Sequence, residues 1–189
     1  MHWYVALPLT ALIIIVSAFF VVIEFSLLAA RRNRLEETAD SSASARAGLR
    51  SLNELTVMLA GAQLGITAAT FALGSISEPW IHHLLVDLFE ATPLPSAVSY
   101  AVSFALALFI ATFLHLVVGE MAPKSWAIAH PEKALRLVAR PARGFITVFR
   151  PLLLWINTIP NRLVLRAGEQ PVERSAPKGY DAETLQNLV

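Results

Sequence analysis

The sequence contains no cysteine, and this absence excludes several kinds of protein. A disulfide framework, a thiol nucleophile and a cysteine zinc site all require that residue. Charged residues are scarce too, at 15% of the 189 residues against about 25% in an average soluble protein. The formal net charge of +1 gives no support to nucleic-acid binding, which usually needs a strongly basic face. The composition therefore argues against a soluble domain and against a nucleic-acid partner.

Hydrophobic residues take the place of the missing charges. They form 56% of the chain, and the mean hydropathy is +0.58. A membrane-spanning helix needs about 20 mainly apolar residues, and the chain offers three such charge-poor segments. We predict an all-α integral membrane protein that contacts the lipid bilayer, with three transmembrane helices at about 5–30, 55–77 and 96–121. The short charged segment 78–90 is predicted to connect the second and third helices.

Two further segments are predicted to be amphipathic helices along the cytoplasmic membrane surface, at about 41–54 and 131–166. Pro151 and Pro160 are expected to interrupt the second of them. Residues 1–168 would then form one transmembrane domain. The polar segment 169–189 contains prolines and a glycine, which indicates a linker to a cytoplasmic domain.

Lysine and arginine predict the orientation of the chain. Five of them lie between the first and second spans, ten follow the third, and segment 78–90 has none. The positive-inside rule therefore places the N-terminus outside and the C-terminus in the cytoplasm of a multi-pass protein of the inner (plasma) membrane. No basic segment precedes the first span, so we expect a retained helix and not a cleaved signal peptide.

Two carboxylates, Glu24 and Glu120, fall within or at the end of predicted spans. A charged side chain at a helix centre costs roughly 2.5–3.5 kcal/mol on insertion scales, so such a residue suggests a function. The orientation places both near the inner interface. For Glu24 a second interpretation is open, in which it pairs with the arginines that follow at 31–34.

Small polar residues follow one face of the second span at helical spacing: Gln63, Thr67, Thr70 and Gly74. Ser17 shares a face with Glu24 in the first span, since the two are seven residues apart. Hydroxyl, amide, carboxylate and carbonyl oxygens are the ligands of hard cations such as Mg²⁺ or Na⁺.

Each of these polar residues also has a purely structural interpretation. A serine or threonine in a membrane helix often bonds to its own backbone or packs at a helix interface. Gly61 and Gly65 indicate close helix packing. His115 is expected to donate a hydrogen bond across a helix interface.

The segment Gly119-Glu120-Met121-Ala122-Pro123-Lys124 predicts an opened helix. Pro123 has no N–H for the carbonyl of Gly119 and clashes with it, so the helix must open or end there. A freed carbonyl persists at membrane depth only where it lines a cavity or meets a partner. Glu120 and that carbonyl can supply part of the coordination shell of a cation. Lys124 can restrain Glu120 or extend its ammonium group to the inner membrane surface.

These segments together resemble the transmembrane domain of the CorC/CNNM family of magnesium transporters, including bacterial hemolysin-like members. The resemblance covers roughly residues 5–170 and rests on five ordered segments: SAFF at 17–20, EF at 24–25, RRNRLE at 31–36, QLGIT at 63–67 and GEMAPK at 119–124. It implies a homodimer with an ion site between the three helices, open to the cytoplasm. It also implies that cytoplasmic CBS domains follow and that ATP binds only there.

The resemblance implies that Glu120 and the carbonyl of Gly119 bind the transported Mg²⁺, with hydroxyls from the first two spans. We expect the metal ligands to be Glu120, Gly119, Ser17, Thr67 and Thr70, with Glu24, Gln63, Ser26, Pro123 and Lys124 in supporting roles. The chain departs from the family pattern at Val21, Val22 and Ile23, which are apolar where many members carry a serine.

Two functions follow as hypotheses. The first is Mg²⁺ export from the cytoplasm, with Na⁺ as the possible coupling ion. The alternative, favoured by the apolar residues at 21–23, is a dimeric anchor for a cytoplasmic ATP or Mg²⁺ sensor that regulates another transporter. An intramembrane protease is rejected, because the spans contain no aspartate pair and His115 has no convincing serine partner, and no enzyme is expected.

Overall fold

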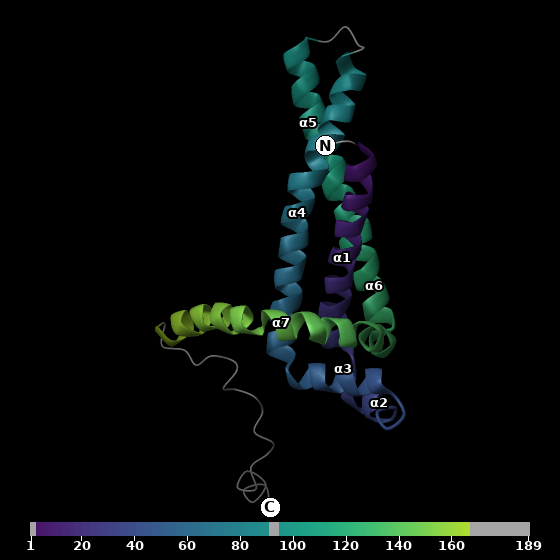
Figure 1. The fold of residues 1–189 in the computed structure, drawn as a ribbon, viewed down its shortest axis with the longest axis vertical. Helices are drawn as coiled ribbons and strands as arrows, with labels where there is room; N and C mark the ends of the chain where they lie inside the picture. The colour runs from purple at the N-terminus through teal and green to yellow at the C-terminus, as the bar shows by residue number, and fades with distance from the viewer. Residues whose placement is uncertain (1–2, 91–94, 167–189) are drawn as a thin grey trace, which may run out of the picture. The chain divides into compact units, whose positions relative to one another are not determined.

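A computed structural model describes residues 3–90 and 95–166, and in this part of the chain every regular element is helical. Besides α7, the long helical segments are α1, α4 and the continuous run α5–η1–α6 (Figure 1). The elements are α1 (Trp3–Ala29), α2 (Arg32–Glu36), α3 (Ala43–Asn53), α4 (Leu55–Glu90), α5 (Ser96–Leu114), the π-helix η1 (His115–Met121), α6 (Ala122–Ala129) and α7 (Pro131–Arg166).

The three predicted membrane spans are confirmed as helices long and apolar enough to cross a bilayer. They are Tyr4–Ala29, Leu55–Phe89 and Ser96–Ala129. The second and third are longer than predicted, because α4 continues through segment 78–90 and the third span continues beyond residue 121. Pro79 lies inside α4 without ending it. Next to it, Trp80, Ile81 and Leu85 pack against α5, and this packing offsets the lost backbone hydrogen bond.

Glycine allows α1 and α4 to approach closely. A Cβ atom added to Gly65 would lie 2.4 Å from the ring of Phe20, so α1 places an aromatic side chain directly on the α4 backbone. The prediction that Gly65 serves helix packing is confirmed. Further along the same interface, Ile13 of α1 packs with Ala69 and Leu73 of α4.

Small residues form the buried face of α5, at a spacing of four residues: Ser99, Ser103, Ala107 and Ala111. Ala107 and Ala111 pack against Ile81 of α4. The opposite face of α5 exposes large apolar side chains such as Phe109, which is 64% exposed. An apolar exposed surface of this kind suits a helix that faces lipid.

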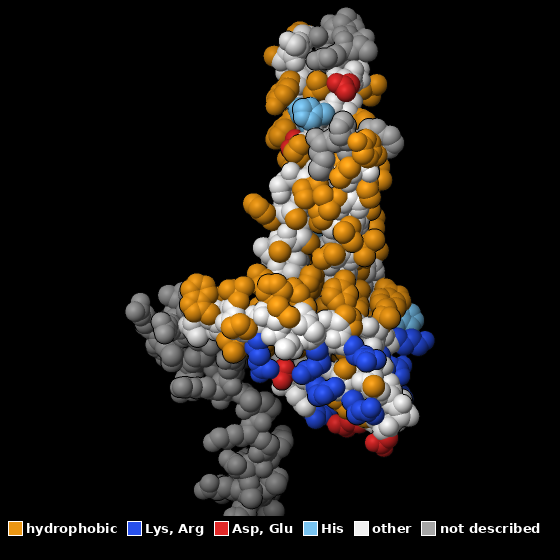
Figure 2. All heavy atoms as spheres, in the orientation of Figure 1, with side chains coloured by type: hydrophobic (Ala, Val, Ile, Leu, Met, Phe, Trp, Pro, Cys, Tyr) orange, Lys and Arg blue, Asp and Glu red, His pale blue; other side chains and the backbone are white. Residues whose placement is uncertain are grey.

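Basic side chains gather at the end of the spans where α1 ends and α4 begins (Figure 2). There α2, α3 and the first part of α7, residues 131–147, pack together, with Leu35 and Leu135 on either side of Gly48. Two ion pairs join sequence-distant parts of this region. Arg31 lies 3.7 Å from Glu132, and Arg143 lies 3.5 Å from Glu54.

The helix α7 differs from its prediction in one respect. It is a single helix from Pro131 to Arg166, and Pro151 and Pro160 do not interrupt it. Proline fixes φ near the helical value and removes one N–H donor, so it can lie within a long helix that keeps its other hydrogen bonds. The predicted linker at 169–189 lies outside the described residues, and the division of the chain at residue 168 stays a prediction.

Candidate ion site

The third span is widened by one π-helical turn, η1, at His115–Met121. At its end the N–H of Ala122 donates to the carbonyl of Val117, five residues earlier, in place of the α-helical partner four residues earlier. Pro123 follows directly and cannot donate to Gly119, so the chain around Gly119 lacks one α-helical bond. The irregularity expected near Gly119 is therefore a π-helix within a continuous helical span. Such turns occur frequently at functional sites.

A buried hydrogen bond ties this turn to α1. The Ser17 hydroxyl and His115 Nε2 are 2.8 Å apart, and both residues are buried. The expectation that His115 bonds across a helix interface is confirmed. The expectation that His115 has no convincing serine partner is wrong. It failed because a hydroxyl 98 residues away is identified only by the way the helices pack.

The position of the His115 ring leaves no space for a side chain at residue 119. A Cβ atom on Gly119 would lie 2.7 Å from His115 Cδ2 and 3.6 Å from Ile14 Cγ2. Such a short distance is sterically forbidden, so the imidazole rests on the bare backbone of the glycine. His115 and Gly119 are four residues apart, and the π-turn places them in contact.

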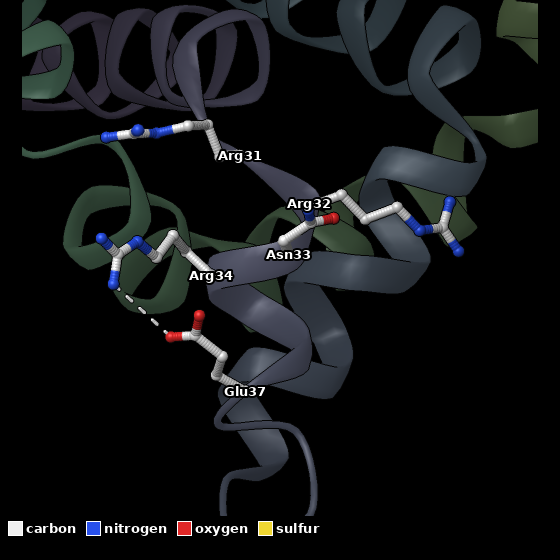
Figure 3. Close-up of a pocket in the computed structure, with 5 residues that line it drawn as sticks. All are labelled: Arg31, Arg32, Asn33, Arg34 and Glu37. Atoms are coloured by element: carbon white, nitrogen blue, oxygen red, sulfur yellow. Dashed lines mark ion pairs between the residues drawn. The ribbon is translucent and has the colours of Figure 1, made fainter.

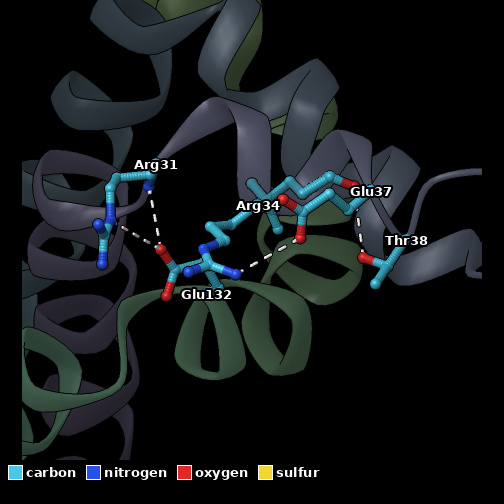
Figure 4. A network of polar contacts seen from close by, with 6 residues as sticks. Arg31, Arg34, Glu37, Thr38 and Glu132 are labelled. Atoms are coloured by element: carbon cyan, nitrogen blue, oxygen red, sulfur yellow. Dashed lines mark hydrogen bonds and ion pairs between the residues drawn. The ribbon is translucent and has the colours of Figure 1, made fainter.

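Glu24 of α1 is bound by Gln63 of α4, whose Nε2 donates to the Glu24 carboxylate at 3.4 Å. The carboxylate is half-buried, five residues before the C-terminal end of α1. The arginines that follow in sequence have other partners. Arg31 pairs with Glu132 and Arg34 with Glu37 (Figure 4). Arg32 pairs with Glu36. The structure therefore favours a role for Glu24 within the helix bundle over pairing with that arginine cluster.

Lys124 lies over an aromatic ring near the C-terminal end of α1. Its Nζ is 4.4 Å from the centroid of Phe25, a cation–π contact. Phe25 directly follows Glu24 in the sequence. Glu120, three residues before Pro123, is half-buried at the end of η1.

One predicted ligand, Thr70, and one predicted supporting residue, Ser26, form hydrogen bonds within their own helices. Thr70 donates to the Ile66 carbonyl at 2.9 Å, and Ser26 donates to the Ile23 carbonyl at 3.2 Å. Thr67 is exposed on α4. The structure thus brings Ser17 and Gly119 together around His115, and Glu24 and Gln63 together nearer the basic end. Within residues 3–90 and 95–166, no three His, Asp or Glu side chains converge on one point.

His115 is the residue that the predicted ligand set lacked. It hydrogen-bonds to Ser17 and covers Gly119. Its signal in the sequence was a single imidazole inside the apolar segment 96–121.

The helix α2 and the residues at its two ends border a basic cavity of about 560 Å³ at the same end of the spans (Figure 3). Arg31, Arg32, Asn33, Arg34 and Glu37 line it. The Arg31 and Arg34 side chains extend to one side and Arg32 to the other. The cavity therefore presents several separated guanidinium groups and no single convergent anion site.

Taken together, the three long apolar helices and the widened third span define an integral membrane protein with polar contacts between its spans. A family profile described as the cyclin M transmembrane N-terminal domain, abbreviated CNNM, matches residues 8–189. The chain belongs to this CNNM family.

Curated relatives support the same assignment. The UPF0053 protein YhdT of Bacillus subtilis is 41% identical over 153 residues, covering 80% of this chain and 33% of the relative. An uncharacterized protein of Mycobacterium tuberculosis is 37% identical over 167 residues, covering 88% of this chain and 47% of the relative. The UPF0053 protein YhdP of Bacillus subtilis is 37% identical over 164 residues, covering 86% of this chain and 37% of the relative. The chain spans about a third to a half of the length of these relatives.

Proposed function

We propose that this chain is the membrane domain of a magnesium transporter that exports Mg²⁺ from the cytoplasm, coupled to Na⁺ entry. The observation that carries the proposal is the π-helix at Gly119 and Glu120, in a span of a CNNM-family protein. A widened turn leaves backbone carbonyls without their usual donors next to a carboxylate. That combination supplies oxygen atoms to a hard cation.

Glu120 is the central residue of the proposed ion site. Its carboxylate is half-buried at the C-terminal end of η1, where an isolated charge is costly and a bound cation would neutralise it. The Gly119 carbonyl is the neighbouring ligand. The Ser17 hydroxyl keeps lone pairs beyond its bond to His115 and can accept a cation on the same side.

Glu24 and Gln63 form the proposed inner entrance to this site. Their hydrogen bond joins α1 to α4 near the basic end of the spans, where the positive-inside rule places the cytoplasm. Thr67 and Thr70 complete the polar side of α4. We propose that Mg²⁺ approaches Glu120 along this polar face, while Lys124 is held aside by Phe25.

The location and assembly of the protein belong to the same proposal. The orientation follows from the basic residues at one end of the spans and implies an N-terminus outside the plasma membrane. The relatives are two to three times as long as the matched region, which leaves room for a cytoplasmic ATP-binding CBS domain. We also propose a homodimer, as in the family that the sequence resembles.

Thermal unfolding of the purified chain during a Mg²⁺ titration tests the ion site. A ligand that binds only the folded state raises the free energy of unfolding by RT ln(1 + [L]/Kd). A real Mg²⁺ site should therefore raise the unfolding temperature as the Mg²⁺ concentration increases above Kd. We expect this rise in the wild type at constant high Na⁺ or K⁺, and its loss in Glu120→Gln. Glu37→Gln, which changes an exposed carboxylate outside the spans, is the matched control and should behave as the wild type.

Mg²⁺ flux into and out of proteoliposomes tests the transport step. We expect Glu120→Ala to abolish Na⁺-dependent Mg²⁺ movement while the protein elutes at the same size as the wild type. Equal flux in the variant and the wild type would overturn the proposal.

A dimeric anchor for a cytoplasmic sensor is the second candidate. Its supporting observation is that Thr70 and Ser26 bond to their own helix carbonyls and that Val21, Val22 and Ile23 are buried and apolar. An anchor would carry no ion, so both the wild type and Glu120→Gln would give flat Mg²⁺ titrations.

A further inference from the structure

The first part of α7, residues 131–147, runs across the long helices and not along them (Figure 1). Its side chains fall on three faces. One face is buried against the rest of the protein and consists of small and aliphatic residues: Ala134, Leu135, Val138, Ala139, Ala142 and Ile146. The other two faces, one apolar and one basic, are exposed or half-exposed.

The apolar stripe of α7 consists of Leu137, Pro141 and Gly144, at a spacing of three or four residues. All three residues are exposed, and Leu137 is 69% exposed. In the C-terminal part of the helix, Val148 and Trp155 are seven residues apart and are 71% and 64% exposed. Exposed apolar side chains on a helix that runs across membrane spans are typical of a helix in the membrane interface.

The basic stripe of α7 consists of Lys133, Arg136 and Arg140, also at a spacing of three or four residues. It flanks the apolar stripe, because Arg136 directly precedes residue 137 and so lies about 100° round the helix from it. The whole helix contains seven Lys and Arg residues and one acidic residue, Glu132, which pairs with Arg31 of the segment before α2. The positive charge of α7 is therefore not compensated within the helix.

The neighbouring helices α2 and α3 differ from α7 in both respects. In the described segment 30–54, which contains them, no large hydrophobic side chain is exposed. Both arginines of α2 pair with nearby acidic residues, Arg32 with Glu36 at 2.8 Å and Arg34 with Glu37 at 3.6 Å. Of these three helices, α7 combines an exposed apolar surface with uncompensated positive charge.

We propose that α7 binds phospholipids with anionic headgroups in the cytoplasmic leaflet. The apolar stripe enters the acyl-chain region, and Lys133, Arg136 and Arg140 contact phosphate groups beside it. An amphipathic helix binds a membrane through its buried apolar area and through attraction to anionic lipids. The negative potential of the cytoplasmic surface attracts basic residues that lie close to it. The inference goes beyond the ion site and needs only the proposed orientation, with the basic end of the spans in the cytoplasm.

An acidic soluble domain is the competing occupant of the basic stripe. Its charge would match, but an acidic surface offers no cover for Leu137, and exposed apolar area is costly in water. A phospholipid supplies both an anionic group and an apolar chain, in the same side-by-side order as the two stripes. Only His130 separates α6 from α7, so a lipid that holds α7 also holds the inner end of the third span.

Thermal unfolding of the purified chain in mixed micelles tests the headgroup preference. Zwitterionic phosphatidylcholine is replaced stepwise by anionic phosphatidylglycerol at constant total lipid, with EDTA present so that no Mg²⁺ contributes. We expect a saturating rise in the unfolding temperature. Arg136→Gln/Arg140→Gln should weaken the apparent affinity for phosphatidylglycerol about 25-fold, since each basic residue near an anionic surface contributes about fivefold. Arg34→Gln/Arg50→Gln, which removes the same charge from α2 and α3, should behave as the wild type.

A spin label tests whether the apolar stripe faces lipid. The chain has no cysteine, so Gly144→Cys and Thr147→Cys each carry a single label, and a Cβ at Gly144 meets no atom within 4 Å. Thr147 is the matched control, because it is exposed and lies on the basic side, seven residues after Arg140. In bilayers with phosphatidylglycerol, we expect the label at 144 to collide mainly with dissolved oxygen and the label at 147 with a water-soluble nickel chelate. Equal access of the chelate to both labels would overturn the inference.

Three results of the lipid titration would also contradict the inference. They are an equal rise in phosphatidylcholine alone, an equal rise with inorganic phosphate in place of phosphatidylglycerol, and an equal loss of affinity in the two double variants. If Arg136→Gln/Arg140→Gln is not recovered as folded protein, Arg140→Gln alone should weaken the affinity about fivefold, and an unchanged affinity counts against the basic stripe. A flat Mg²⁺ titration with an intact phosphatidylglycerol effect would contradict the proposed function alone. The reverse pattern would contradict only the inference about α7.

Discussion

The hydroxyl of Ser17 and the Nε2 atom of His115 are 2.8 Å apart in the interior of the helix bundle, although 98 residues separate them in the chain. This contact joins α1 to the π-helical turn of the third span. It also holds the imidazole ring over Gly119, where a side chain would clash. One hydrogen bond thus connects helix packing to the turn that carries Glu120.

We predict that Ser17 and His115 are energetically coupled. Hydrogen bonds between membrane helices contribute about 0.6 kcal/mol on average, up to about 1.7 kcal/mol. Ser17→Ala and His115→Ala should each destabilise the protein, and the double variant should be less destabilised than the sum by about that amount. The measurement is the free energy of unfolding in detergent for all four proteins. Strictly additive losses would show that the contact contributes nothing.

Substitution of Gly119 by alanine should distort the π-turn. The new Cβ would lie 2.7 Å from His115 Cδ2, and overpacking of this kind typically costs about 1–3 kcal/mol. Gly144→Ala is the control, because a Cβ there meets no atom within 4 Å. Thermal unfolding should show a lower midpoint for Gly119→Ala only.

A second variant shows whether His115 is the cause of that clash. Gly119→Ala combined with His115→Ala should recover part of the stability, since the ring that occupies the space is gone. If the double variant is no more stable than Gly119→Ala, the loss of stability comes from the helix backbone and not from the clash with His115.

Gly65→Ala should separate α1 from α4. Its Cβ would lie 2.4 Å from the Phe20 ring, and Phe20 also packs edge-on against Phe145 at 4.9 Å between ring centroids, so the ring cannot easily move away. We expect a loss of about 1–3 kcal/mol in the free energy of unfolding. Gly74→Ala, on the same helix with open space around it, should be close to neutral. Equal stability of the two variants would contradict the close α1–α4 packing.

The ion pair between Arg143 and Glu54 should stabilise the protein only weakly. Its atoms are 3.5 Å apart, and both side chains are partly exposed. Exposed pairs contribute at most about 1 kcal/mol and are screened by salt. A double-mutant cycle with Arg143→Ala and Glu54→Ala should give a coupling below this value that falls further in 1 M salt. A coupling that salt leaves unchanged would indicate a more buried contact.

The spans were predictable because apolar length and the lack of charge determine them locally. The C-terminal part of α4 was not, since the charges of segment 78–90 indicated a connection between helices. Trp80, Ile81 and Leu85 keep that segment helical by packing on α5, the next helix in the chain. The same limit applies to Glu24, whose partner Gln63 is 39 residues away.

The sequence by itself determined that this protein lies in a membrane, that its polar residues fall on particular helix faces and that the third span must be irregular near Pro123. These are properties of hydropathy, helical spacing and proline chemistry, which act within about one turn of helix. Only the tertiary structure decided that Ser17 meets His115 and that Gln63 binds Glu24. Such pairings depend on how the helices rotate and approach each other, which close packing between the helices controls.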